Sequence, residues 1–195
     1  NIYTVGQVDS LFAAVDFEIN EQWHSSFQMG RTNDKAKEAA DNIDLSTTGS
    51  SGEFNTQKTE ATWVNNIFLG DDHSLTLGLD YLRDEVTGST TYDEATRDNE
   101  AAFAQYQIQL GAVDTNFGLR YDDNEQFGDF TTASFLAGMN LTDNLRLIGS
   151  VSEGFKAPTF NDLYYPGYGD PSFKPEESTN YEIGLNANVG NALVT

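Results

Sequence analysis

The chain has 195 residues, no cysteine, a mean hydropathy of −0.49 and a net charge of −21, from 31 acidic and 10 basic residues. The absence of cysteine excludes disulfides and thiolate metal sites, and the negative charge argues against nucleic acid as a partner. An acidic surface attracts divalent cations, although it can also serve solubility alone. The chain contains no apolar run long enough for a membrane-spanning helix, but a membrane strand needs an apolar residue only at every second position.

Apolar and polar residues alternate with a period of two along most of the chain, which predicts β-strands with two different faces. From Leu11 to Ile19 the odd positions are apolar, and from Leu75 to Tyr81 the pattern repeats. The stretch 33–40 consists of good helix formers without an apolar stripe, and we expect a loop or a single turn there. Strands are predicted at 11–19, 23–30, 60–70, 74–82, 102–110, 116–122, 133–141, 145–152 and 180–188, and a tenth strand is expected to begin at Ala192.

The connections between these strands alternate between short and long, which is typical of an up-and-down outer-membrane barrel. A soluble β-sandwich is the alternative, but its Greek-key connections would mix the two lengths. About nine or ten strands leave an open edge that is not viable in lipid, so we expect a segment of a larger barrel. The predicted fold class is therefore all-β, an antiparallel up-and-down transmembrane β-barrel segment. The short connections are 20–22, 70–73, 112–115, 142–144 and 189–191, and the long ones are 31–58, 83–99, 122–130 and 153–178.

The sequence contains no catalytic constellation, so we do not expect an enzyme. Its two histidines, His24 and His73, lack companions at metal-ligand spacing. Two long connections carry the candidate binding groups. The acidic residues of 31–58 form either a solvated loop or a Ca²⁺ site. The group at 83–99 that includes Tyr92 suits a large hydrogen-bonding ligand, with a solvated loop again as the alternative.

The segment from Gly154 to Ser178, GFKAPTFNDLYYPGYGDPSFKPEES, holds all four prolines of the chain. With the strand that follows, it resembles the signature of TonB-dependent outer-membrane receptors, which combines KAP, LY, a GDP turn, a KPEES stretch and YEIG. The similarity extends over most of the chain from about residue 54 onward. It implies a barrel of about 22 strands with an N-terminal plug, located in the outer membrane of a bacterium and energised by TonB. Neither the plug nor a TonB box is present in residues 1–195, which we interpret as one partial barrel domain.

Among these receptors the sequence is most similar to those that transport cobalamin. This likeness implies import of cobalamin or a related corrinoid through extracellular loops ordered by Ca²⁺. It places Asp34 and Asp44 at acidic positions that bind the cation, and Asn99 at a position that contacts the corrin. The first alternative is a receptor of the same family for a ferric siderophore or haem, and the second is a soluble acidic β-sheet binding domain.

Overall fold

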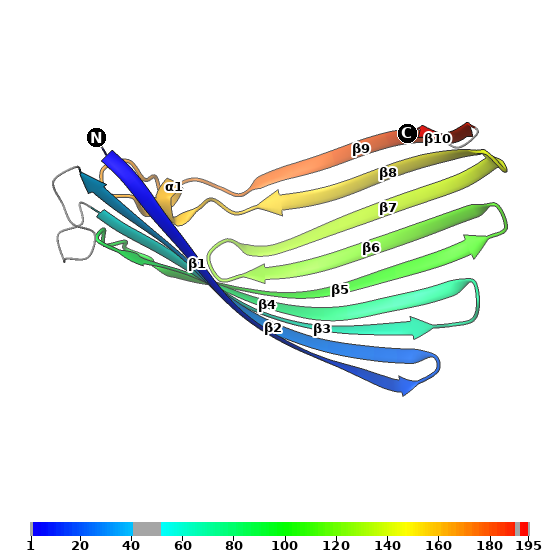
Figure 1. Ribbon diagram of the computed structural model, residues 1–195, viewed down its shortest axis with the longest axis horizontal. Helices are drawn as coiled ribbons and strands as arrows, with labels where there is room; N and C mark the ends of the chain where they lie inside the picture. Colours follow the sequence, from blue (N-terminus) through cyan, green and yellow to red (C-terminus); the bar gives the residue numbers. More distant parts are fainter. Residues whose placement is uncertain (1, 41–51, 190–191, 195) are drawn as a thin grey trace.

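The protein folds into one antiparallel sheet in which the spatial order of the strands is their order in the sequence (Figure 1). The computed structural model describes residues 2–40, 52–189 and 192–194. None of the helices in these ranges is long and apolar enough to cross a membrane. The strands are β1 (Ile2–Asn20), β2 (Trp23–Ala40), β3 (Gly52–Phe68), β4 (His73–Gly88), β5 (Thr96–Leu110), β6 (Val113–Asn124), β7 (Gly128–Thr142), β8 (Leu145–Lys156), β9 (Glu176–Val189) and β10 (Ala192–Val194), with the helix α1 (Phe160–Tyr164) between β8 and β9.

The nine predicted strands and the start of the tenth at Ala192 are confirmed, but β1 to β9 are longer than expected, at 12 to 19 residues. The prediction of a loop or turn at 33–40 is wrong, because these residues continue β2. All of them pair with β1, and 33–38 also pair with β3. Their charged side chains find partners across the strands: Lys35 lies 3.5 Å from Asp9, and Lys37 lies 3.6 Å from Glu53. Cross-strand pairing of opposite charges therefore supports a strand that has no apolar stripe.

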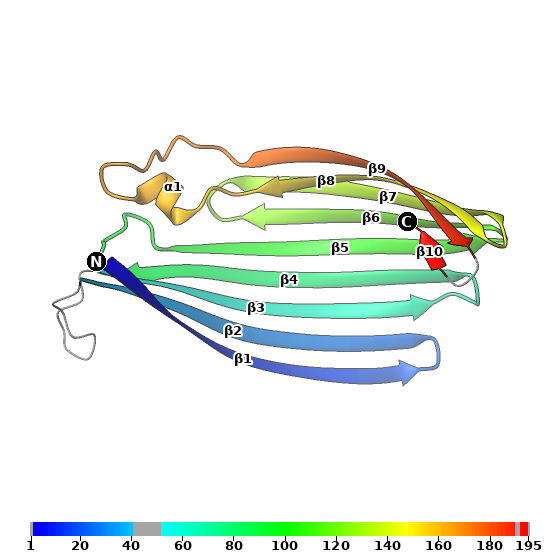
Figure 2. The same ribbon diagram turned by 45° about the horizontal axis from the view of Figure 1, so that its top comes forward.

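The connections lie at two ends of the sheet (Figure 2). We call the end that holds residues 89–95, 125–127 and 157–175 the loop end, and the opposite end the turn end. The prediction of a long connection at 122–130 is wrong, since β6 and β7 are joined by 125–127 alone. The side-chain oxygen of Asn124 accepts hydrogen bonds from the backbone N–H groups of Gln126 and Phe127, both at 3.2 Å, and Gly128 takes a φ of 79°. An Asx turn closed by a left-handed glycine makes this hairpin tight.

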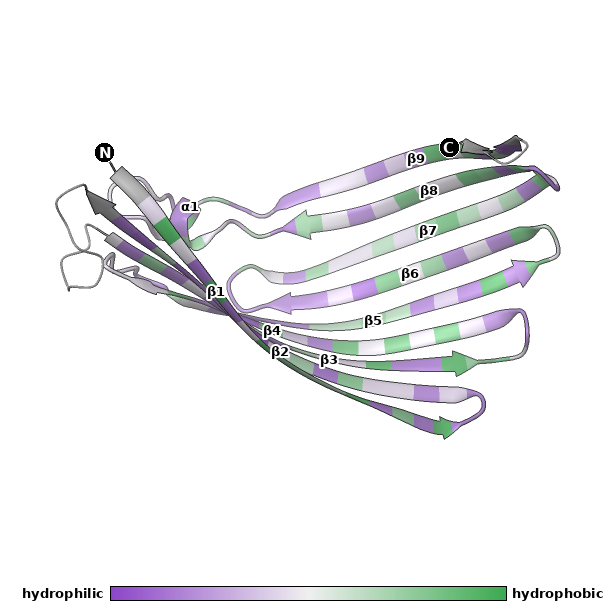
Figure 3. Ribbon diagram, viewed as in Figure 1, coloured by the Kyte–Doolittle hydropathy of each residue, from purple (hydrophilic) through white to green (hydrophobic). Residues whose placement is uncertain are grey.

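Hydrophobic and hydrophilic residues alternate along most strands (Figure 3), and this alternation places them on opposite faces of the sheet. We call the face that carries Phe27, Trp63, Leu79 and Phe117 the apolar face, and each of these side chains is at least 40% exposed. The opposite face, the polar face, carries Gln, Asn, Asp and Arg side chains at the alternate positions of the same strands. A soluble sandwich would cover its apolar face with a second sheet, whereas the described residues form a single sheet. So large an exposed apolar surface is typical of contact with lipid or with a partner.

Polar atoms on the apolar face have partners close to the sheet. The indole nitrogen of Trp23 donates to Asn65 at 3.0 Å, and that of Trp63 donates to the hydroxyl of Ser25 at 2.9 Å. Ser25 and Asn65 are themselves buried. Both tryptophans can therefore lie in an apolar environment without an unsatisfied N–H group.

Candidate functional site

The loop end contains the main cluster of buried apolar side chains among the described residues, and the connection 157–175 builds it. Its helix α1 begins with a capping box, in which Thr159 is the N-cap. The Asp162 carboxylate accepts hydrogen bonds from the Thr159 backbone N–H at 2.9 Å and from its hydroxyl at 2.7 Å, and the Asp162 N–H donates back to the hydroxyl at 3.2 Å. Pro158 precedes the cap, where it fixes φ and has no N–H to satisfy.

Helix α1 packs against the loop between β4 and β5. Leu163 is completely buried, and Phe160 is 6% exposed. Phe160 forms a cluster with Val86 at the end of β4 and Tyr92 in the loop, and Phe54, Ala95 and Tyr164 pack around it. The connection after β8 therefore reaches back over the shorter β6–β7 hairpin to a part of the chain about 70 residues earlier, and the apolar contact fixes it there.

Three polar contacts join the same two segments. The Tyr92 hydroxyl donates to the side-chain oxygen of Asn161 at 2.5 Å. Arg97, whose side chain is 10% exposed, donates to the backbone carbonyl of Pro158 at 2.9 Å, and its guanidinium lies 5.1 Å from the centroid of the Phe160 ring. These contacts satisfy the polar groups that packing of α1 would otherwise leave buried. We call the assembly of 89–95 and 157–169 the loop-end platform.

The environment of Tyr92 sets its protonation. Burial raises the pKa of the Tyr92 phenol above its ordinary value of 10.0, and the neighbouring Tyr165 ring raises it further. The phenol therefore stays protonated at neutral pH and remains the donor in its hydrogen bond to Asn161.

Aromatic side chains project from the outer surface of the platform. Tyr165 is 42% exposed and Tyr168 is 89% exposed. Their ring centroids are 6.2 Å apart, and Tyr165 lies 6.5 Å from Tyr92 in an edge-to-face arrangement. A rigid segment that exposes large rings can bind a ligand with a low cost in side-chain entropy.

A polar network occupies the polar face of β4, β5 and β6, below the platform. The Asp122 carboxylate is 3% exposed and accepts from the Arg120 guanidinium at 2.9 Å and from the Asn99 amide at 2.9 Å. Arg120 also pairs with Asp80 at 2.5 Å, and the Asn124 amide donates to Asn99 at 3.1 Å. The network fixes these side chains on the polar face of the sheet, because each member has a charged or amide partner.

The structure places Tyr92 and Asn99 in two different sets of hydrogen bonds. Tyr92 is buried, and its hydroxyl is bound to Asn161, while Asn99 is bound to Asp122 and Asn124. Asp34 is an exposed residue of β2 that pairs with Val8 and Thr56, and Asp44 lies outside the described residues. Within the described ranges, no group of three or more His, Cys, Asp or Glu side chains could hold a metal ion. A ligand contact at Tyr92 or Asn99 and a cation at Asp34 and Asp44 remain predictions.

Several residues that build the site were not singled out from the sequence. Arg120 occupies an alternate position of the predicted strand 116–122, so its placement on the polar face could have been derived from period two. Arg97 was expected in the long connection 83–99, but the structure places it in β5. The partner of Tyr92 could not have been derived this way, since Asn161 lies 69 residues further along the chain.

The capping box gives the platform a pH dependence. Hydrogen bonds from Thr159 lower the pKa of the Asp162 carboxyl below its ordinary value of 3.8, and nearby Lys156 acts in the same direction. Because the pKa in the folded state is the lower one, the stabilisation is complete above about pH 4 and is lost as the pH falls through the folded value. We expect amide exchange in α1, corrected for its intrinsic rate, to accelerate below pH 4. The variant Asp162→Asn should not show this acceleration below pH 4. An acceleration of equal size in that variant would contradict the role of the Asp162 carboxyl in the pH dependence.

Comparisons with known proteins agree with this architecture. Residues 3–195 match the family model described as TonB dependent receptor-like, beta-barrel. The chain is 35% identical over 167 residues to the vitamin B12 transporter BtuB of Photobacterium profundum, covering 85% of this chain and 27% of the relative. It is 33% identical over 132 residues to BtuB of Vibrio vulnificus, covering 66% of this chain and 22% of that relative.

A mutant of the ferric enterobactin receptor PfeA of Pseudomonas aeruginosa has a similar fold, with a TM-score of 0.82 at 16% identity over 97% of this chain and 33% of the other. That likeness shows the fold alone. The chain spans about a quarter of the length of the two BtuB relatives, which accounts for an open sheet where a barrel would close. The chain therefore belongs to the TonB-dependent receptor-like β-barrel family, whose members are bacterial outer-membrane proteins, and forms a fragment of such a barrel.

Proposed function

We propose that this chain is part of an outer-membrane receptor that binds cobalamin or a related corrinoid and imports it with energy delivered by TonB. The observation that carries the proposal is the 35% identity to a vitamin B12 transporter over 85% of the chain. The receptor would carry its cargo without covalent chemistry. In this proposal the apolar face contacts membrane lipid, and the polar face lines the interior of the barrel.

The loop-end platform supplies a surface suited to such a cargo. Tyr165 and Tyr168 expose rings to solvent from a segment that is fixed at α1. A corrin macrocycle is large and flat, so it can stack on tyrosine rings while its amide groups bind polar side chains. Ca²⁺ would act at the connection that follows β2, where Asp34 and Asp44 could bind it and hold that loop in its binding conformation.

A second candidate cargo is a ferric siderophore, because the PfeA mutant shares the fold at a TM-score of 0.82. The sequence comparison favours the corrinoid, since the two relatives described above, at 35% and 33% identity, are vitamin B12 transporters. The siderophore therefore serves as the comparison ligand in the test.

The test is equilibrium binding of cyanocobalamin to the full-length receptor, with ferric enterobactin as the comparison ligand. We expect the corrinoid to bind at least about 100-fold more tightly, which corresponds to about 2.7 kcal/mol. Chelation of Ca²⁺, or the double variant Asp34→Asn/Asp44→Asn, should weaken cyanocobalamin binding about tenfold or more.

The matched control is Asp71→Asn, which removes an exposed carboxylate at the turn end and should leave binding unchanged. Tighter binding of the ferric chelate would contradict the proposed cargo. Corrinoid affinity that does not respond to Ca²⁺ or to the double variant would contradict the cation site alone.

A further inference from the structure

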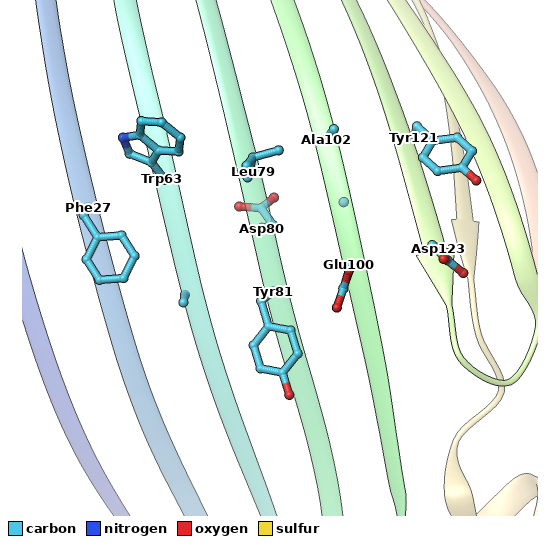
Figure 4. A pocket seen from close by; sticks show the side chains of 11 residues that line it. Phe27, Trp63, Leu79, Asp80, Tyr81, Glu100, Ala102, Tyr121 and Asp123 are labelled. Atoms are coloured by element: carbon cyan, nitrogen blue, oxygen red, sulfur yellow. The ribbon is translucent and has the colours of Figure 1, made fainter.

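Arg97, near the start of β5, carries its charge on the polar face of the sheet. The opposite, apolar face holds a pocket that Tyr81 on β4 and Ala102 on β5 help to line (Figure 4). Asp84 and Arg97 are an odd number of residues away from these two positions, and an odd spacing along a strand reverses the face. Asp84 and Arg97 also pair directly across β4 and β5. The guanidinium therefore lies on the face opposite this pocket.

The Arg97 side chain contacts two different connections of the loop end. It donates to the Pro158 carbonyl at 2.9 Å and lies beside the Phe160 ring, so it contacts the segment that begins α1. Its guanidinium also lies 5.8 Å from the centroid of the Phe127 ring, and a terminal nitrogen lies 3.5 Å from the side-chain oxygen of Gln126. These last two residues belong to the tight connection between β6 and β7. One cation therefore bridges the β6–β7 connection and the start of α1.

The β6–β7 connection reaches the platform through polar contacts. None of the described members of the apolar cluster around α1 comes from residues 125–127. The Gln126 amide donates to the Tyr164 hydroxyl at the end of α1. The two connections therefore meet at this hydrogen bond and at Arg97. The exposed rings of the platform follow α1 directly, so the position of α1 determines where these rings lie.

The burial of Arg97 makes its contacts depend on one another. Its side chain is 10% exposed, and its ion-pair partner Asp84 lies 4.0 Å away. A cation that is largely removed from water needs its hydrogen-bond and ring partners as well. Displacement of α1 would remove the Pro158 carbonyl and one ring from the guanidinium, and displacement of the β6–β7 connection would remove the other ring. Each connection therefore stabilises the contact that the other makes.

We propose that Arg97 is a positioning residue for cargo capture, whose guanidinium joins the β6–β7 connection to α1 so that the exposed rings are in place before the cargo arrives. The inference rests on the proposed function, because it assigns the loop-end platform to cargo binding. Only receptors with an assembled platform can bind, so a smaller assembled fraction reduces the apparent affinity by the same factor. This loss appears in the association rate constant and not in the dissociation rate constant.

The first test is amide exchange of the full-length receptor without cargo, comparing Arg97→Met with the unmodified protein. Methionine keeps an apolar side chain and removes the charge and all donors. Exchange should accelerate about tenfold in both 125–127 and 159–169, because the two connections lose their shared partner. Acceleration in only one of these two segments would overturn the proposal.

The second test is the kinetics of cyanocobalamin binding to the same two proteins. In Arg97→Met the association rate constant should fall about tenfold, and the dissociation rate constant should stay within about twofold. Faster dissociation with unchanged association would show that Arg97 holds the cargo itself, and would overturn the positioning role. Failure of the unmodified receptor to bind cyanocobalamin would contradict the proposed function, while the exchange test, which uses no cargo, separately decides whether Arg97 joins the two connections.

Arg83→Met is the matched control. Arg83 is adjacent to Asp84 on β4, so it lies at the same level of the sheet but on the opposite face. It pairs with Asp98 at 3.0 Å, and its side chain is 40% exposed. Removing this arginine should leave exchange and cyanocobalamin binding within about twofold.

Arg97→Lys separates the charge from the guanidinium group. Lysine keeps a cation near Asp84 but lacks the planar fork that donates and stacks on rings. Exchange in 125–127 and 159–169 should accelerate at least about threefold in this variant, which also carries the test if Arg97→Met does not fold. Unchanged exchange in the folded Arg97 variants would overturn the proposal.

Discussion

Replacing Leu163 by alanine should release α1 from the sheet and leave the strands paired. Leu163 is completely buried, so its truncation removes apolar contacts and opens a cavity inside the loop-end platform. Such a change typically costs 2–5 kcal/mol, and for this local element we expect at least about 2 kcal/mol. Amide exchange in residues 159–169 of the full-length receptor should then accelerate roughly 30-fold or more.

The control for this experiment is Tyr168→Ala, which truncates a side chain of the same connection that is 89% exposed. Exchange in residues 159–169 should stay unchanged in that variant, while cyanocobalamin affinity should fall if the exposed rings bind the cargo. Unchanged exchange in Leu163→Ala would show that the apolar contact does not hold the connection in place.

The second large effect is expected at the polar network. Arg120→Met leaves the Asp122 carboxylate, which is 3% exposed, without its arginine partner. Removing one member of a buried pair costs roughly 3–5 kcal/mol, and we expect about 2–3 kcal/mol here because the Arg120 side chain is 36% exposed to water. Denaturant unfolding of the full-length receptor in lipid or detergent measures the change.

A double-mutant cycle isolates the interaction between these two residues. Arg120→Met combined with Asp122→Asn should be less destabilising than the sum of the single changes, with a coupling of about 1–3 kcal/mol. Lys35→Met, which breaks an exposed pair with Asp9 at 3.5 Å, should cost less than about 1 kcal/mol. Additive effects of Arg120→Met and Asp122→Asn would contradict direct pairing in the folded receptor.

The sequence predicted the strands wherever apolar and polar residues alternate, as in Leu75 to Tyr81. It did not predict where the strands end. Towards the loop end the same strands continue with charged residues on both faces, so apolar and polar residues no longer alternate there. These parts of the strands are supported by contacts with a neighbouring strand, such as the ion pair of Lys35 with Asp9, which the local sequence pattern does not reveal. The order of the strands followed from the short connections, since a tight turn joins strands that pair.

The site was less accessible from the sequence. Tyr92 was selected as an aromatic side chain in a polar loop, but the structure shows it inside a contact with α1. That contact joins positions 69 residues apart, and the connection 157–175 must cross the β6–β7 hairpin to make it. The sequence analysis predicted a longer connection in this hairpin than the structure has. Contacts of this kind depend on three-dimensional packing, and they are not encoded in the pattern of either segment alone.

The order of the strands also bears on how the chain acquires its structure. Since consecutive strands of the described sheet pair with each other in sequence order, this sheet can grow one hairpin at a time, and none of its strand pairs joins distant parts of the chain. Most of these hairpins close a short length of chain, which keeps the entropic cost of loop closure low, and the connection 157–175 between β8 and β9 is the long exception. Each added strand pairs with the exposed backbone N–H and C=O groups of the edge strand. It then exposes its own unpaired backbone groups at the new edge, and the following strand can pair with these.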